Sequence, residues 1–529
     1  MSEIVADLID GSARRLPSAA ALTFGEETLS YAALAERVAT AAGRLVALGV
    51  GRGERVAVYL DKRIETIVAM FGAAAAGAAF VPVNPLLRPR QVAHILTDCN
   101  VRVLVTSAAR LATLDEVLGG CPDLHTVVLT DGKAESKPAP HVGALPWADA
   151  LGTGPLGTPH RVIDTDMAAI FYTSGSTGLP KGVVLSQRNI VAGAKSVSRY
   201  LENTPEDSIL SVLPLSFDAG FSQLTTAFNV GARVVLLNYL LPQDVARVAG
   251  RERITGLAGV PPLWAQLAAL DWPEPAVKSL RYFTNTGGHM PKATLDRLRA
   301  IFPASAPYLM YGLTEAFRST YLPPSEVDRR PDSIGKAIPN AEILVVREDG
   351  SPCAPGEPGE LVHRGALVAM GYWNDAERTA LRFRPAPQRP GGIMIPEIAV
   401  WSGDTVRMDD EGFLYFVGRR DEMIKTSGYR VSPTEVEEVV YASGLVGEAV
   451  ALGIAHPTLG AAIVIVATPH AGKAVDGAGV IAECKRQLPA YMVPHTVVER
   501  AAIERNPNGK FDRKKLSEEL ADLFAEAER

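Results

Sequence analysis

One short stretch of this chain combines glycines, hydroxyl residues and a lysine in a pattern that suits phosphate binding. Residues 172–182 read YTSGSTGLPKG and directly follow an apolar run at 167–171. Glycine permits backbone conformations that turn successive N–H groups toward one anion, and hydroxyls with one ammonium complete such a site. We therefore predict a loop that wraps a polyphosphate, held by Thr173, Ser174, Gly175, Ser176, Thr177, Gly178 and Lys181.

The Walker P-loop is the obvious competing interpretation of this loop. That motif has four residues between its glycines, followed by Lys and then by Ser or Thr. Here Gly178 is followed by Leu-Pro-Lys-Gly, so both the spacing and the metal-binding hydroxyl are missing. A solvated linker is the other alternative, but a linker of this composition rarely follows a buried strand directly.

The residues around the loop alternate between patterns typical of strands and of helices. Apolar runs predict buried strands at 56–60, 80–83 and 101–106. Helical spacing of apolar residues predicts helices at 31–48, 63–76 and 89–96. This alternation is typical of parallel, doubly wound sheets, so we expect the α/β fold class.

Later changes of pattern divide the chain. Residues 131–160 are rich in Pro and Gly and predict a surface connection. From about residue 334, short strands and turns predict a small β-rich subdomain at about 334–420. We expect this subdomain to complete a large N-terminal domain at 1–420, followed by a small, mobile α+β C-terminal domain at 421–529 that ends in a charged helix.

Composition excludes several functional classes. The net charge of −6, with no run of Lys and Arg, argues against nucleic acid and against an anionic membrane surface. The cysteines have no CxxC spacing, which argues against a zinc site and a disulfide framework. Because the start has no apolar core of signal-peptide length and no apolar run could span a bilayer, we expect a cytoplasmic protein without an integral membrane segment.

The loop belongs to a series of motifs in a fixed order. They are GAAFVPVNP at 77–85, NTGGHMPK at 285–292, MYGLTE at 310–315, GELVHRG at 359–365, WSGDTV at 401–406, GRRDEMIKTSGYRVSPTEVE at 418–437 and NPNGKFDR at 506–513. Over nearly the whole chain this order resembles the adenylate-forming superfamily, which includes acyl-CoA synthetases, peptide-synthetase adenylation domains and luciferases. Residues 332–372 further resemble acyl-CoA ligases associated with bacterial exosortase loci.

The resemblance implies a two-step reaction and its catalytic residues. Members join a carboxylic acid to ATP with release of pyrophosphate, and then pass the acyl group from AMP to the thiol of CoA or of a phosphopantetheinyl carrier protein. Lys510 resembles the mobile catalytic lysine that bridges the carboxylate and the α-phosphate. Thr314 would contact phosphate and Glu315 would bind Mg²⁺. Taken alone, Lys510 would be a solvated turn residue and Glu315 would complement a helix dipole.

The resemblance also implies a nucleotide site beyond the loop. Asp404 would accept hydrogen bonds from the ribose diol, and Arg419 would reach the same sugar. Tyr311 would stack on adenine, although a buried core tyrosine is the alternative interpretation. Arg430 would contact phosphate, and the motif at 285–292 adds Gly287, Gly288 and His289.

Movement of the C-terminal domain between the two half-reactions is a further implication of the resemblance. Asp421 matches the hinge position, and a short polar link suits a change in backbone conformation. The loop near Gly428 would then meet the incoming phosphopantetheine. We expect the thiol acceptor to be supplied in trans.

Asp218 is the most informative residue for the acid substrate. It lies in LPLSFDAGFSQ and resembles the aspartate that holds the α-ammonium in amino-acid adenylation domains. A carboxylate among apolar groups needs a cation or several donors. The alternative is that Asp218 only caps the helix that follows.

Other residues predict the rest of the acid pocket. Arg318 could pair with a second carboxylate of the substrate or with another side chain of the protein. Gly259, Thr284 and Thr286 would line the remaining wall. Together these residues predict a small polar acid, such as one that bears an amino group. A medium- or long-chain fatty acid is the alternative substrate, and a catalytically idle nucleotide-binding scaffold is the third interpretation of the chain.

Overall fold

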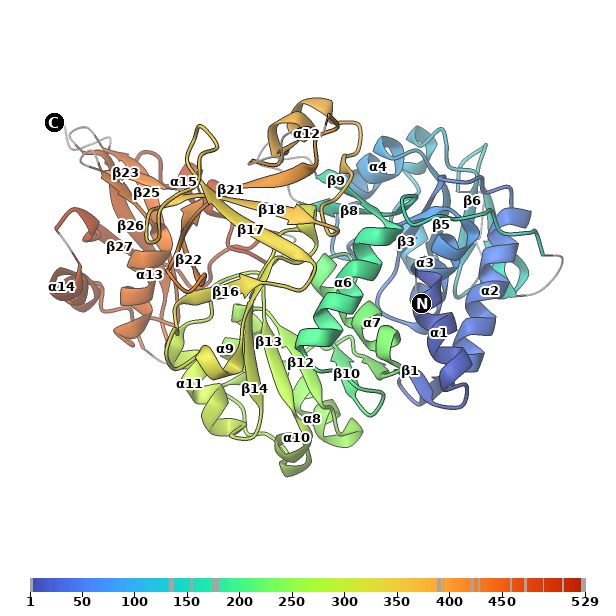
Figure 1. The fold of residues 1–529 in the computed structure, drawn as a ribbon, viewed down its shortest axis with the longest axis horizontal. Coiled ribbons are helices and arrows are strands. Elements are labelled where there is room, and N and C mark those ends of the chain that lie inside the picture. The colour runs from blue at the N-terminus through green and yellow to red at the C-terminus, as the bar shows by residue number, and fades with distance from the viewer. Residues whose placement is uncertain are drawn as a thin grey trace.

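The computed structural model describes the chain from residue 3 to residue 524 with short gaps. The described residues are 3–132, 138–152, 156–173, 180–387, 392, 394–419, 423–426, 429–456, 459–470, 473–488, 490–506 and 509–524. Within them the strands form three sheets, of fourteen, eight and five strands. The eight-stranded sheet lies at the right of Figure 1, the five-stranded sheet at the left, and the large sheet between them.

The eight-stranded sheet has the order β19-β9-β8-β4-β3-β5-β6-β7. Its strands are β3 (Arg55–Tyr59), β4 (Ala79–Pro82), β5 (Val101–Thr106), β6 (Thr126–Leu129), β7 (Gly143–Pro146), β8 (Met167–Thr173), β9 (Lys181–Ser186) and β19 (Gly371–Tyr372). The helices that alternate with its early strands are α2 (Tyr31–Ala47), α3 (Ile64–Ala76), α4 (Pro89–Asp98) and α5 (Ala108–Ala112). The predicted alternation of strand and helix is confirmed, and the central strands are parallel.

One segment of this sheet differs from the prediction. Residues 131–160 were expected to form a surface connection, but Gly143–Pro146 within them pair in parallel with β6 as the edge strand β7. The side chains of β7 are at most half-buried. An edge strand with so little buried surface has no clear apolar pattern, so sequence periodicity does not reveal it.

The fourteen-stranded sheet combines a parallel part with the β-rich part. Its parallel strands are β1 (Ala20–Phe24), β11 (Arg233–Leu236), β10 (Ser208–Ser211), β12 (Gly256–Gly259), β13 (Tyr282–Asn285) and β14 (Ala306–Tyr311). Its antiparallel strands are β2 (Glu27–Ser30), β15 (Thr320–Leu322), β16 (Ser333–Ala337), β17 (Ala341–Val346), β18 (Gly359–Gly365), β20 (Phe383–Pro385), β21 (Ile398–Met408) and β22 (Leu414–Arg419). Because β16 pairs with both β15 and β22, the β-rich strands continue the large sheet.

The helices of this part include one that lies between the two large sheets. They are α1 (Ala6–Arg15), α6 (Gln187–Tyr200), α7 (Asp218–Val230), α8 (Pro242–Glu252), α9 (Pro261–Leu267), α10 (Glu274–Ser279), α11 (Lys292–Ile301) and α12 (Ala376–Arg382). Phe221 of α7 packs against Phe80 of β4 and Phe171 of β8, with ring centroids 4.9 and 5.8 Å apart. The same helix contacts β10 and β11 of the large sheet. This packing fixes Asp218, the first residue of α7, where the two sheets meet.

The C-terminal sheet is smaller and has its own core. Its strands are β23 (Ile424–Thr426), β24 (Tyr429–Val431), β25 (Glu448–His456), β26 (Gly460–Thr468) and β27 (Thr496–Glu499), and its helices are α13 (Pro433–Ala442), α14 (Gly477–Gln487) and α15 (Arg513–Glu519). The expected α/β class, with large N-terminal sheets and a small C-terminal sheet, is confirmed. The domain boundary at Asp421 lies outside the described residues and stays a prediction.

None of the described helices combines the length and the apolar character needed to cross a bilayer.

Candidate active site

Lys181, Glu315 and Tyr372 form a connected group of side chains. Lys181 begins β9, Glu315 lies in the short 3-10 helix η3 (Thr314–Ala316), and Tyr372 ends β19. The Lys181 ammonium lies 3.1 Å from Glu315 Oε1 and donates a hydrogen bond of 2.9 Å to the Tyr372 hydroxyl. The Tyr372 hydroxyl in turn donates to Glu315 Oε1. The group therefore joins the base of the predicted phosphate loop to the predicted metal ligand.

The charge state of Glu315 follows from this group. Burial raises the pKa of its carboxyl, but the Lys181 ammonium and the Tyr372 hydroxyl outweigh burial and hold the pKa below the ordinary value of 4.5. Glu315 is therefore ionised at neutral pH. An ionised carboxylate is the ligand type that Mg²⁺ prefers.

The donor set fits a magnesium ion that is shared with phosphate. In the part of the chain that the structure describes, no cluster of three or more His, Cys, Asp or Glu side chains could hold a metal by itself. Mg²⁺ commonly takes one or two carboxylates and completes its shell with water and substrate phosphates. Glu315 suits that role, and a bound Mg²⁺ would neutralise charge on the phosphate oxygens.

The base of the phosphate loop is closed by a strand pair. Thr173 ends β8 and lies opposite Lys181 in the antiparallel register of β8 and β9. The Thr173 hydroxyl is buried and has no hydrogen-bond partner among the described residues. A buried hydroxyl without a partner is costly, and a phosphate oxygen would satisfy it. Ser174, Gly175, Ser176, Thr177 and Gly178 lie outside the described residues.

Tyr311 and Asp404 meet where the parallel and the β-rich strands adjoin. Tyr311 ends β14, and its hydroxyl donates a hydrogen bond to Asp404 Oδ2 on β21. Asp404 is only 5% exposed. Arg419 lies opposite Asp404 in the register of β21 and β22, which places the two residues predicted to bind ribose side by side along the backbone. The contact between Tyr311 and Asp404 was not predicted.

Asp218 and Arg318 form a buried ion pair. Arg318 Nη1 lies 2.8 Å from Asp218 Oδ2, and the side chains of Arg318 and Asp218 are 5% and 16% exposed. Thr314 Oγ1 donates a longer hydrogen bond of 3.4 Å to the other oxygen, Oδ1. Phe217, not Asp218, occupies the N-cap of α7, and among the described residues no side chain caps that helix. For Arg318, the structure shows the alternative that was left open, pairing with another side chain of the protein. For Asp218, it does not show the alternative, a cap on the helix that follows.

The predicted wall residues gather at the carboxyl ends of β12 and β13. Gly259 lies opposite Asn285 in the parallel register, and the Thr286 N–H donates to the Gly259 carbonyl at 3.2 Å. A Cβ on Gly259 would lie 2.7 Å from the indole of Trp264, so only glycine fits there. The Trp264 indole donates to the carbonyl of Thr284, and the Asn285 amide donates to the carbonyl of Gly288. Such strand ends are common ligand sites in open α/β sheets.

His289 follows the turn at Gly287 and Gly288. It contacts a residue of the C-terminal part of the chain. Its Nε2 lies 3.2 Å from Glu438 Oε1 on α13. Burial lowers the pKa of His289, and burial together with Asp332, Glu435 and Glu437 raises the pKa of Glu438 to about 7.

The remaining predicted residues belong to the C-terminal region. Lys510 is exposed in a tight turn, where its N–H donates to Asn506 Oδ1 and its carbonyl accepts from the Asn506 N–H. Arg430 lies opposite Lys425 in the register of β23 and β24. Asp421 and Gly428 lie outside the described residues. The structure does not bring Lys510 into hydrogen-bonding contact with Glu315 among the described residues.

Comparison with known proteins identifies the family. Residues 9–373 match the family described as AMP-binding enzyme, and residues 435–510 match the AMP-binding enzyme C-terminal domain. This chain belongs to the AMP-binding enzyme family. It is an adenylate-forming acid–thiol ligase of the superfamily that contains acyl-CoA ligases and the adenylation domains of peptide synthetases.

Relatives of this AMP-binding enzyme include free-standing and multidomain proteins. It is 33% identical to an L-proline--[L-prolyl-carrier protein] ligase of Streptomyces coelicolor, over 93% of this chain and 92% of that protein. It is 30% identical to tyrocidine synthase 3 of Brevibacillus parabrevis over 96% of this chain, but it spans only 8% of that protein. The structure of an O-succinylbenzoate CoA synthetase of Bacillus subtilis with ATP and magnesium is 25% identical, with a TM-score of 0.81 over 96% of this chain and 99% of that chain.

Sequence reasoning missed one member of the candidate active-site group in this AMP-binding enzyme. Tyr372 contacts both Lys181 and Glu315, yet it lies 57 positions after Glu315, outside any motif with an assigned role. Only the pairing of β19 with β9 brings it there, and a strand of two residues gives no sequence pattern.

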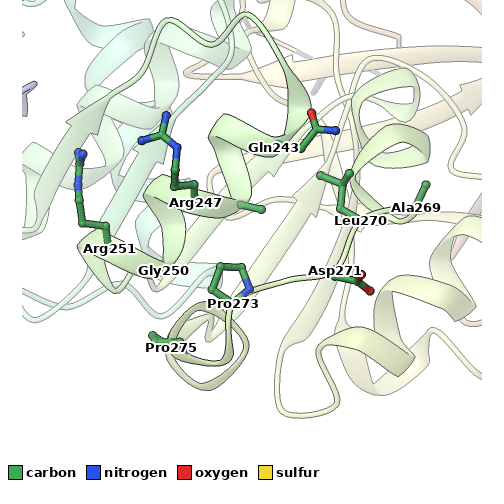
Figure 2. Close-up of a pocket in the computed structure, with 10 residues that line it drawn as sticks. Gln243, Arg247, Gly250, Arg251, Ala269, Leu270, Asp271, Pro273 and Pro275 are labelled. Atoms are coloured by element: carbon green, nitrogen blue, oxygen red, sulfur yellow. The ribbon is translucent and has the colours of Figure 1, made fainter.

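A separate surface cavity lies away from these residues. It has a volume of about 680 Å³ and lies beside α8 and the chain that leads into α10. Figure 2 shows Arg247, Arg251 and Asp271 among its lining side chains. None of the residues predicted to bind nucleotide or acid lines it.

Proposed function

We propose that this acid–thiol ligase activates a small polar acid, with amino acids as the first class to test. The acceptor capacity left on Asp218 Oδ1 carries the proposal. Arg318 engages Asp218 Oδ2, whereas Oδ1 receives one long hydrogen bond, from Thr314, within the described part of the chain. A carboxylate has about four acceptor positions, so Oδ1 retains capacity for a substrate ammonium. The end-to-end similarity to a prolyl-carrier protein ligase supports the same class.

In the first half-reaction the acid carboxylate attacks the α-phosphorus of ATP and pyrophosphate leaves. Two anions must approach each other, so preorganised positive charge lowers the barrier. We assign this role to Lys510 and the holding of the departing phosphates to Lys181, Thr173 and the loop they enclose. Asp404 and Arg419 hold the ribose, Tyr311 lies against adenine, and Arg430 contacts phosphate.

In the second half-reaction a thiol attacks the carbonyl carbon of the acyl-adenylate and AMP leaves. We propose that the C-terminal domain turns about Asp421 between the two steps, so that Lys510 withdraws and the segment at Gly428 approaches the thiol. The acceptor is either CoA or the phosphopantetheine of a separate carrier protein.

A medium- or long-chain fatty acid is the second candidate substrate class. One observation favours it: Arg318 already neutralises Asp218, so burial of that carboxylate does not require a substrate cation. Membership of the exosortase-associated subgroup would agree with an acyl-CoA product.

Exchange of labelled pyrophosphate into ATP tests the proposal. The purified chain is assayed with Mg²⁺ and a panel of amino acids, aryl acids and fatty acids. We expect exchange with a small amino or polar acid, and mass analysis of the product with CoA present then identifies the acceptor. Exchange with fatty acids alone would favour the second class, and no exchange with any acid would contradict the proposed activity.

A further inference from the structure

Phe317, two residues after Glu315, has a backbone conformation that side chains rarely adopt. Its φ is 56° and its ψ is −47°. The Arg318 N–H donates to the carbonyl of Ala316 at 2.5 Å, across Phe317. Positive φ, negative ψ and this hydrogen bond between residues two apart define the strained form of the γ-turn. A bulky residue at positive φ is an outlier that surrounding structure must hold in place.

The Phe317 ring packs against α6 at Gly193, where that helix carries no side chain. Phe317 is fully buried. A Cβ on Gly193, in the middle of α6, would lie 2.4 Å from Phe317 Cδ1 and 2.6 Å from Cε1. Any other residue at 193 would therefore displace the ring. Glycine is unfavourable inside a helix, so the close approach of Phe317 gives a physical reason for its presence there.

The turn separates two side chains that act in different parts of the site. Before it, Glu315 contacts Lys181 and Tyr372. After it, Arg318 contacts Asp218, and the Ser319 N–H donates to the carbonyl of Tyr311 at 3.3 Å. Both arrangements are made within residues 315–318, and the positive φ of Phe317 lies between them.

We propose that Phe317 is a positioning residue, locked by Gly193, that sets Glu315 and Arg318 in their separate contacts. Burial of the ring against Gly193 offsets the strain of positive φ at a side-chain-bearing residue, a strain that glycine would not carry. The turn aims the metal ligand in one direction and the partner of Asp218 in another. This inference rests on the proposed roles of Glu315 and Asp218. Its first measurement, the affinity for ATP with Mg²⁺, needs no acid substrate.

Two substitutions at residue 317 distinguish the effect of its backbone conformation from the effect of its buried side-chain volume. Phe317→Gly removes the ring but accepts positive φ, whereas Phe317→Val keeps more of the buried volume but opposes positive φ. We expect Phe317→Gly to retain affinity for Mg·ATP, measured by titration calorimetry. Phe317→Val should lose about tenfold, because the strain of such a backbone conformation corresponds to roughly a factor of ten in an equilibrium constant. A pure packing role predicts the opposite order and would overturn the proposal.

Gly193→Ala tests the close packing of the Phe317 ring against Gly193. We expect it to weaken Mg·ATP binding and to slow pyrophosphate exchange, and Gly193→Ala with Phe317→Gly should restore both because no ring remains to be displaced. The matched control is Gly72→Ala in α3, where the new Cβ would lie 2.8 Å from Ala41 Cβ. That control should lower the melting temperature while Mg·ATP affinity stays unchanged. Unchanged affinity in Gly193→Ala, or no rescue in the double variant, would contradict the lock.

Failure of the proposed function is distinguishable from failure of this inference. If no acid of the panel supports pyrophosphate exchange, the proposed function is contradicted. If the variants still show the expected order of Mg·ATP affinities, the positioning role of Phe317 is supported. Exchange activity combined with the reverse order of affinities would do the opposite.

Discussion

Lys181 and Glu315 form an ion pair of 3.1 Å although they lie 134 positions apart in the chain. Lys181 belongs to the eight-stranded sheet, whereas Glu315 follows β14 of the large sheet. The pair thus connects the two sheets at the point where the proposed phosphate site and the proposed metal ligand meet. Each charge neutralises the other in this pair, and we propose that both contact Mg·ATP when it binds.

Glu315→Gln should remove the part of the unfolding free energy that depends on pH through ionisation of this carboxyl. Because the folded pKa of Glu315 is held below 4.5, its contribution is complete above pH 4.5 and is lost as the pH falls through the lower, folded value. The difference in unfolding free energy between wild type and Glu315→Gln should therefore grow with pH in the acid range and be constant above pH 4.5. Urea unfolding at a series of pH values measures it, and parallel profiles would contradict the assigned charge state.

Lys510→Ala should abolish adenylation but not nucleotide binding. Loss of one preorganised group at the developing charge commonly slows a reaction by about 10²–10³-fold. Pyrophosphate exchange should fall by at least that factor, whereas ATP affinity and thioester formation from added acyl-adenylate should persist. Lys514→Ala removes an equally positive, exposed side chain from the same region and is the control. Equal losses in both variants would remove Lys510 from the mechanism.

Asp218→Asn should discriminate between the two substrate classes. If an ammonium binds Oδ1, exchange with the amino acid should fall about a hundredfold, the range expected when one partner of a buried charge pair is lost. Exchange with a fatty acid should change little. The substitution also leaves the buried Arg318 guanidinium without the carboxylate that neutralises it, so Asp218→Asn with Arg318→Met is the control for stability. The double variant should recover thermal stability without recovering activity toward the amino acid.

Lys62 should make stability rise at alkaline pH. It is 8% exposed and donates hydrogen bonds to the carbonyls of Val212 and Leu213, in the segment that leads from β10 to Asp218. Burial lowers the pKa of Lys62 from 10.5 to about 8. The unfolded chain binds the extra proton between these values, so stability should increase with pH there, by about 3 kcal/mol relative to Lys62→Met.

Unfolding of wild type and Lys62→Met from pH 8 to pH 10.5 measures that difference. Asn238, whose side chain bonds the backbone of Lys62, stays in place in both proteins and keeps the comparison local. A difference independent of pH would mean that the pKa of Lys62 is not lowered in the folded protein.

The local elements of the fold could be predicted because their signals are local. The strand expected at 101–106 is β5, Val101–Thr106, and the helix expected at 31–48 is α2, Tyr31–Ala47. A short, mostly apolar run rich in valine marks a buried strand, and apolar spacing that stops at Gly49 marks an amphipathic helix. Residues such as Lys181 and Glu315 could be proposed because their motifs carry chemistry at fixed spacing.

The contacts between distant segments could not be predicted in this way. Asp218 and Arg318 lie 100 positions apart, and nothing in either motif encodes their pairing. The double pairing of β16 with β15 and β22 likewise depends on register between strands that the sequence separates widely. The strained turn at Phe317 requires knowledge of the gap at Gly193, which only the packed helix reveals.

The position of β1 has a consequence for synthesis on the ribosome. Although β1 is the first strand to be made, its parallel neighbour is β11, and all early strands of the eight-stranded sheet lie between them in the chain. A nascent chain therefore carries the hairpin of β1 and β2 with the outer edge of β1 unpaired until Arg233–Leu236 has emerged. An open strand edge is a template for pairing with other chains. The interval between the synthesis of these two strands is thus one in which the exposed edge of β1 is open to pairing with another chain.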